Sequence, residues 1–151
     1  MPPRLRELLD VFETVTDRSE RASLLIDLAD QFREVPDRIA TRPFPEAHRV
    51  QRCESEAYVW AEPLPDGTLK YHFAVENPQG ISARAMAVIL DEALSGTPPE
   101  ATECVPTDIC FAFFGKELSM GKGQGLMGMV TLLKGLARQF ALARDRGFTQ
   151  C

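Results

Sequence analysis

The spacing of apolar residues changes twice along this 151-residue chain, and that change most constrains its fold. Residues 5–32 place leucine and phenylalanine at helical spacing, residues 57–73 alternate apolar with polar side chains, and helical spacing returns from residue 83. Apolar residues three or four positions apart line one face of a helix, whereas alternation is typical of a strand with one buried face. The pattern predicts an α+β domain with a small sheet between N-terminal and C-terminal helices.

The ends of the expected helices carry residues that start or stop helices. Asp17 is expected to cap the second N-terminal helix, because a short acceptor side chain can bind the free N–H groups of the first turn. Pro36 stops that helix and opens an irregular connection over residues 36–45. Later helices are expected over residues 83–94, 98–104, 106–114 and 124–146.

The middle of the chain predicts a three-stranded antiparallel meander packed against the N- and C-terminal helices. Its strands are expected near Val50, over residues 57–61 and over residues 69–73. The last two are joined by a turn at residues 65–67, where glycine can take a positive φ. The third strand is expected to have one face in solvent, with His72 on it.

Composition limits the class of protein. The length fits one domain, here 1–151, and 44% hydrophobic with 26% charged residues is typical of a soluble globular chain. A net charge of -5 argues against a nucleic-acid partner. No uninterrupted apolar run approaches the roughly 20 residues of a membrane span. The N-terminus lacks the apolar core of a signal peptide, so we expect a cytoplasmic protein with free thiols and no membrane partner.

Cys53 is the leading candidate for chemistry. It follows a polar stretch and directly precedes the alternating run, which predicts a position at the tip between the first two strands. A structural cysteine is usually a small buried hydrophobe, yet the neighbours of Cys53 are Arg52 and Glu54. Loops on rigid scaffolds are where reactive groups concentrate. The sequence therefore indicates a reactive thiol at this position.

The other cysteines favour a different interpretation. Cys104 and Cys110 have five residues between them in an apolar segment, unlike the two intervening residues of most zinc sites. They are expected to pack within short helices. Cys151 is the last residue and is expected to be an exposed chain end.

Glycines cluster at 121, 123 and 125, just before the expected start of the final helix. The spacing does not match a phosphate-binding loop of the Walker type. Free N–H groups at a helix start still favour an anion, and Lys122 adds a positive charge there. The segment could hold a phosphate, a thiolate or a persulfide, or it could simply begin a helix.

Two segments resemble the SufE family of sulfur-acceptor proteins. Residues 50–59 are similar to the family pattern Val-x-Gly-Cys-x-Ser-Gln-Val-[Trp/Tyr], with Cys53 at its cysteine. Residues 122–126 are similar to Arg-Ser-Gln-Gly-Leu at the start of the last long helix. The chain departs from these patterns at several residues, among which Arg52 replaces glycine, Glu56 replaces glutamine and Lys122 replaces arginine. Residues 76–79 also replace the usual Gly-Asp-Ser-Asp run.

The resemblance implies a sulfur carrier in iron–sulfur cluster assembly. A SufS-type, pyridoxal-phosphate cysteine desulfurase would pass persulfide sulfur to Cys53 and would be stimulated by the exchange. The sulfur would then reach a SufBCD-like cluster scaffold, with Lys122 assisting transfer. The resemblance implies no resident cofactor beyond a transient persulfide on Cys53, no metal, and a monomer or weak homodimer.

Three alternatives remain at this stage. An IscU-like scaffold for iron–sulfur clusters or zinc would need Cys104 and Cys110 to converge with Cys53. A cysteine hydrolase would need His48 or His72 beside the thiol, since acyl transfer requires an adjacent base. The third alternative is an interaction module in which Cys53 has no chemical role.

Overall fold

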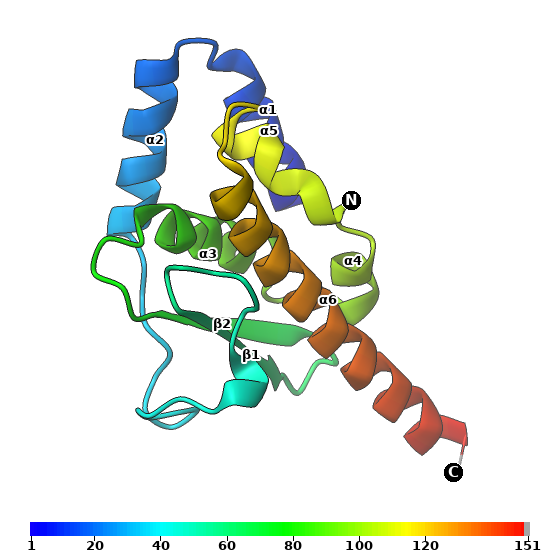
Figure 1. The fold of residues 1–151 in the computed structure, drawn as a ribbon. Coiled ribbons are helices and arrows are strands. Elements are labelled where there is room, and N and C mark those ends of the chain that lie inside the picture. Colours follow the sequence, from blue (N-terminus) through cyan, green and yellow to red (C-terminus); the bar gives the residue numbers. More distant parts are fainter. Residues whose placement is uncertain (150–151) are drawn as a thin grey trace.

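The computed structural model describes residues 1–149, and their side chains as far as residue 145. Helices surround a small sheet, and the long helix α6 crosses beside the strands and projects past them at its C-terminal end (Figure 1). Cys151, expected to be an exposed chain end, lies outside the described residues. The elements in chain order are α1 Pro3–Thr14, α2 Arg18–Asp30, the 3-10 helix η1 Glu46–His48, β1 Ala57–Pro63, β2 Leu69–Val75, α3 Ile81–Leu94, α4 Pro99–Glu103, the 3-10 helix η2 Thr107–Ile109, α5 Cys110–Phe114 and α6 Met120–Thr149.

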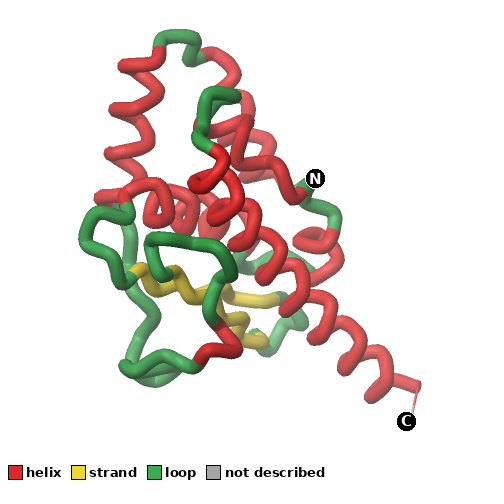
Figure 2. Tube along the Cα trace, viewed as in Figure 1, coloured by secondary structure: helices red, strands yellow, loops and turns green. Residues whose placement is uncertain are grey.

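The sheet within the described residues has two antiparallel strands, so the expectation of three was wrong (Figure 2). β1 and β2 pair from Ala57 opposite Val75 to Pro63 opposite Leu69. The expected strand at Val50 is reduced to a single bridge between Arg49 and Tyr58. The chain enters this bridge from η1 and leaves it into a loop that packs on α6, so no run of residues remains extended beside β1. The α+β class was predicted correctly.

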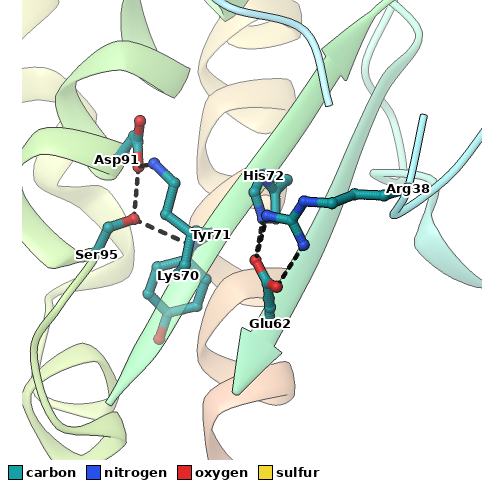
Figure 3. Close-up of polar contacts among 7 residues, drawn as sticks. All are labelled: Arg38, Glu62, Lys70, Tyr71, His72, Asp91 and Ser95. Atoms are coloured by element: carbon teal, nitrogen blue, oxygen red, sulfur yellow. Dashed lines mark hydrogen bonds and ion pairs between the residues drawn. The ribbon is translucent and has the colours of Figure 1, made fainter. Parts of the chain in front are cut away.

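The main hydrophobic core fills the space between the helices and one face of the sheet. α3 packs on β2 and on α1 and α2, while α6 packs on β1 and α4. Alternate β2 residues Leu69, Tyr71 and Phe73 point into this core and are at most 3% exposed. Lys70 lies on the edge of this layer, where its Nζ donates to Oδ1 of Asp91 in α3 at 2.6 Å (Figure 3).

The second face of the sheet is covered as well, contrary to the expectation of a solvent-facing strand side. The proline-rich segment after α2 packs Val35 and Phe44 against Trp60 and Ala74. His72 is consequently only 8% exposed. Its imidazole does not lie in solvent but forms an ion pair or hydrogen bond with β1.

The partner of His72 is the Glu62 carboxylate, and the same carboxylate also binds Arg38 (Figure 3). The Nε2 atom of His72 lies 2.9 Å from Oε1 of Glu62. Arg38 donates to both carboxylate oxygens, at 2.5 and 3.0 Å. This cluster fastens the proline-rich segment to the sheet.

Helix ends agree with the sequence patterns only in part. α2 ends at Asp30, well before Pro36, so the prediction that Pro36 stops it was wrong, and α6 begins earlier than expected. Asp17 caps α2 through a hydrogen bond that its Oδ1 accepts from the Ser19 N–H at 3.4 Å, as predicted. α6 begins at Met120 and not near residue 124, because Ser119 takes the capping position: its carbonyl accepts from the Gly123 N–H at 2.8 Å. The glycine cluster therefore lies inside the helix.

One helix, α6, bears on the expectation that no apolar run in this chain is long enough to span a membrane. Among the described residues, the stretch Met120–Asp145 is long and apolar enough to cross a membrane by length and composition alone. Lys134 and Arg138 interrupt its apolar sequence. Core helices of soluble proteins meet the same criterion; α6 packs on β1 and α4, and 33% of its most apolar stretch is buried inside the structure.

Glu62→Gln should flatten the dependence of stability on pH in the acid range. Hydrogen bonds from Arg38 and His72 lower the pKa of Glu62 to about 2, so the carboxylate stabilises the folded state above its unfolded pKa of about 4.3. That contribution is lost as the pH falls through about 2. We expect the free energy of unfolding, measured with urea, to fall less between about pH 5 and 2 in Glu62→Gln than in the wild type.

Glu13→Gln is the matched control, since it removes an exposed carboxylate from α1. A Glu62→Gln profile parallel to that of the wild type would contradict a stabilising role for the Arg38–Glu62–His72 cluster.

Candidate functional site

Cys53 lies in a tight loop, residues 50–56, which we call the cysteine loop. The Val50 N–H donates to the Ala57 carbonyl at 2.8 Å and closes the base of the loop, and the Glu56 N–H donates to the Cys53 carbonyl at 3.1 Å. Arg52 and Glu56 have left-handed backbone angles, with φ of 57° and 53°. Such angles cost an L-residue roughly 1–2 kcal/mol. Contacts outside the loop must offset this cost.

The first external contact is with the segment after β2. The Asn77 N–H donates to the Ser55 carbonyl and the Glu76 N–H to the Glu56 carbonyl, each at 3.1 Å. Gly80 permits this close approach, since a Cβ atom there would lie 3.0 Å from Cβ of Ser55. Residues 76–79, where the chain departs from the SufE pattern, thus hold one side of the cysteine loop.

The second external contact is with α6, along a face made by Gly121, Gly125 and Gly128. This spacing of four and three residues places them on one side of a helix. A Cβ atom on Gly125 would lie 3.3 Å from Cα of Cys53 and 3.4 Å from its Sγ. The cysteine loop therefore rests directly on the backbone of α6. We call these three residues the glycine face.

Cys53 lies in the loop between the bridge at Arg49 and β1, and it is half-buried against the main core, less exposed than a thiol at a polar hairpin tip would be. The thiol still borders two open clefts. One, of about 450 Å³, is the arginine cleft; the other, of about 350 Å³, is the lysine cleft. The arginine cleft is lined by Glu46, Arg49, Val50, Gln51, Arg52, Cys53, Glu54, Gly121 and Gln124. The lysine cleft is lined by Cys53, Glu54, Ser55, Asn77, Gln79, Gly80, Ile81, Ser82, Ala83, Gly121, Lys122, Gly125 and Leu126.

The fold brings the two residues selected from the sequence, Cys53 and Lys122, to the same cleft. Lys122 is exposed in the first turn of α6, and its N–H donates to Oγ of Ser119 at 3.3 Å. The N-terminal end of this 30-residue helix carries a partial positive charge. A negatively charged sulfur in the lysine cleft would meet two favourable electrostatic contributions.

Other polar residues at the cleft were not identified from the sequence. Ser55 and Ser82 offer hydroxyl groups, Asn77 and Gln79 offer amides, and Glu54 contributes a carboxylate near Gly121. The sequence signals were the unusual run at 76–79 and the glycine spacing. Neither signal says by itself that these segments meet.

The two other cysteines within the described residues, Cys104 and Cys110, line neither cleft. Cys110 is fully buried at the start of α5, and burial raises the pKa of its thiol, which makes it a poor nucleophile. Cys104 is exposed at the end of α4. Among the described residues no three His, Cys, Asp or Glu side chains are grouped as a metal would require, so the IscU-like alternative gains no support.

Both histidines have structural partners elsewhere. Nδ1 of His48 lies 2.9 Å from the Val59 carbonyl oxygen, and its ring stacks on Trp60 with centroids 5.3 Å apart. His72 binds Glu62. Neither histidine lines a cleft beside Cys53. The cysteine-hydrolase alternative, which needed one of these histidines beside the thiol, therefore gains no support.

The chain was compared with protein families and with known proteins. Residues 6–137 match the SufE family, described as an Fe-S metabolism associated domain. A SufE-like protein 1, chloroplastic/mitochondrial, from Arabidopsis thaliana is 22% identical over 135 residues. That match covers 89% of this chain and 34% of the Arabidopsis protein, so the chain spans about a third of its length.

Among solved structures, a hypothetical protein from Thermus thermophilus has the same fold. Its solution structure superposes with a TM-score of 0.76 at 24% sequence identity. The superposition covers 94% of this chain and 98% of the other. The helix and sheet arrangement described above is therefore one that a distant sequence also adopts.

Proposed function

This chain belongs to the SufE family of Fe-S metabolism associated domains, and on that premise we propose that it is a sulfur acceptor and carrier. Family membership connects it with the biogenesis of iron–sulfur clusters. In the proposal, Cys53 receives persulfide sulfur from a cysteine desulfurase and carries it to a cluster scaffold.

The observation that carries the proposal is the convergence of Cys53 and Lys122 on the lysine cleft. The two residues are 69 positions apart by their numbers, 122 and 53, and meet only because the cysteine loop packs on α6. A thiol beside a cation, a helix N-terminus and several hydroxyl and amide groups is suited to form and hold an anionic persulfide.

The transfer step is a thiol–persulfide exchange without net oxidation. The Cys53 thiolate attacks the outer sulfur of the persulfide on the desulfurase cysteine. A sulfur–sulfur bond forms on Cys53 while the bond to the desulfurase cysteine breaks, and that cysteine leaves as a thiolate. The proton released by Cys53 can pass to the leaving thiolate. Delivery to the scaffold repeats the same exchange with Cys53 as the leaving group.

Lys122 is proposed to stabilise the negative charge on the outer sulfur after transfer. Its side chain is exposed and lines the same cleft as Cys53. Ser55 and Ser82 supply hydroxyl donors in that cleft. The Glu54 carboxylate repels an anion in this cleft. The net electrostatic stabilisation of the anionic sulfur therefore depends on Lys122.

The desulfurase is proposed to approach over the lysine cleft. Ile81, at the start of α3 and in the cleft wall, is 48% exposed. Met120, next to the cleft residue Gly121, is 79% exposed. We propose that these two exposed apolar side chains form part of the contact surface. We propose a SufS-type desulfurase and a SufBCD-like scaffold as partners, in the cytoplasm.

Cys53→Ser should abolish sulfur acceptance. We expect intact-mass spectrometry, after incubation with a cysteine desulfurase and cysteine without reductant, to detect added sulfur on the wild type and none at position 53 in the variant. Cys104→Ser removes an exposed thiol elsewhere and should load normally. Equal loading of Cys53→Ser, or no sulfur on the wild type with desulfurases that turn over, would contradict the proposal.

Lys122→Ala should slow sulfur loading while leaving the melting temperature unchanged, because the side chain is exposed. Hydrogen bonds to charged groups contribute about 1.5–3 kcal/mol, so we expect a rate reduced roughly tenfold or more. Lys122→Arg should retain most of the rate. Lys116→Ala, in the loop before α6, controls for the loss of a positive charge; an equal effect there would mean that position 122 has no special role.

Ile81→Asp should raise the carrier concentration needed for half-maximal loading, without changing the maximal rate. Losing burial of a partly exposed isoleucine at a contact weakens binding by about 1–2 kcal/mol, or roughly five- to thirtyfold. Ile26→Asp is a close control, since Ile26 in α2 is 47% exposed and is not one of the cleft residues. If both variants load like the wild type, the desulfurase contacts another surface.

A further inference from the structure

One contact between the cysteine loop and α6 does not involve the cysteine itself. A Cβ atom on Gly128 would lie 2.9 Å from the Gln51 carbonyl oxygen and 3.0 Å from Cγ1 of Val50. We propose that Gly128 is a positioning residue for Cys53: by lacking a side chain, it lets the cysteine loop settle on α6 with the thiol half-buried. Its identity then controls how often Cys53 is accessible to a reaction partner.

The groups that meet Gly128 cannot easily move aside. The Gln51 oxygen belongs to the backbone, and Val50 is 1% exposed within the main core. Val50 is also hydrogen bonded to Ala57 at the base of the loop. A side chain at position 128 must therefore shift the loop backbone away from α6.

The closed conformation of the cysteine loop is only weakly stabilised, so such a shift should occur easily. Its two left-handed residues, Arg52 and Glu56, each cost roughly 1–2 kcal/mol when the loop is closed. The offsetting contacts are a few backbone hydrogen bonds and the packing on the glycine face. Lost packing at Gly128 should therefore favour a loop conformation in which these residues relax and the thiol is more exposed.

α6 supplies a matched control in Gly135. A Cβ atom there would meet no atom within 4 Å. Alanine in place of a helical glycine stabilises a helix by about 1 kcal/mol, and both substitutions share this gain. They differ in that only Gly128→Ala disturbs the cysteine loop. Gly125 is less suitable for the test because it touches Cys53 directly.

The test measures the rate of alkylation of each cysteine by iodoacetamide, with peptides identified by mass. Cys104 is exposed and serves as the internal reference, whereas Cys110 is buried and reports global unfolding. We expect the Cys53 rate relative to Cys104 to rise roughly fivefold or more in Gly128→Ala, the range expected when a minor conformer gains population. Gly135→Ala should leave the ratio unchanged. Equal ratios in the two variants would overturn the proposal.

A second pair of variants tests the loop even if Gly128→Ala fails to fold. Arg52 is exposed, and both substitutions remove its charge. Asparagine adopts left-handed angles readily, whereas valine does so at high cost. Arg52→Val should therefore show faster Cys53 alkylation than Arg52→Asn, and equal rates would contradict the role of the closed loop.

The consequence for sulfur transfer rests on the proposed function. Dithiothreitol should remove persulfide from Cys53 faster in Gly128→Ala than in Gly135→Ala, because in Gly128→Ala the cysteine loop is closed in a smaller fraction of molecules. Alkylation needs no desulfurase, so failure to load sulfur would reject the proposed function and leave the role of Gly128 standing. Unchanged alkylation in Gly128→Ala would reject the positioning role alone.

Discussion

The close packing of a loop backbone against a helix backbone is the contact on which the site depends. It depends on Gly125 and Gly128, which lie on one face of α6, and is the reason that residues near 53 and near 122 share a cleft. Larger side chains at Gly125 or Gly128 would separate the two segments. The polypeptide therefore places the Cys53 thiol by omitting side chains as much as by supplying them.

The rest of the fold holds this contact in place from both sides. β1 starts immediately after the cysteine loop and is fixed by its pairing with β2, while the turn after β2 binds the loop through Ser55 and Glu56. α6 is fixed by its packing on β1 and α4. The loop itself contributes strain at Arg52 and Glu56. Rigid neighbours thus hold a segment that would not adopt this conformation alone.

The sequence predicted what depends on local pattern. The helical stripes, the Asp17 cap and the α+β class follow from spacing and capping chemistry, and the SufE resemblance was confirmed. The sequence could not predict the features that depend on contacts between segments distant along the chain. The bridge at Arg49 did not extend into a strand because the following loop packs on α6, and His72 was covered by a proline-rich segment with no regular pattern. The start of α6 was predicted too late because glycines suggested a loop. In the structure these glycines lie within α6, where they allow the cysteine loop to pack on the helix backbone.

The left-handed backbone angle at Arg52 also affects the fraction of molecules in which the cysteine loop is closed. The SufE pattern has glycine at this position, where such an angle carries almost no cost. A penalty of roughly 1–2 kcal/mol on the closed form corresponds to about a five- to thirtyfold smaller ratio of closed to open molecules. A chain with arginine here would spend a larger share of its time with the thiol available and a smaller share protecting it. A substitution that changes one backbone angle can thus shift the balance between an exposed and a covered thiol, without any change in the reacting groups.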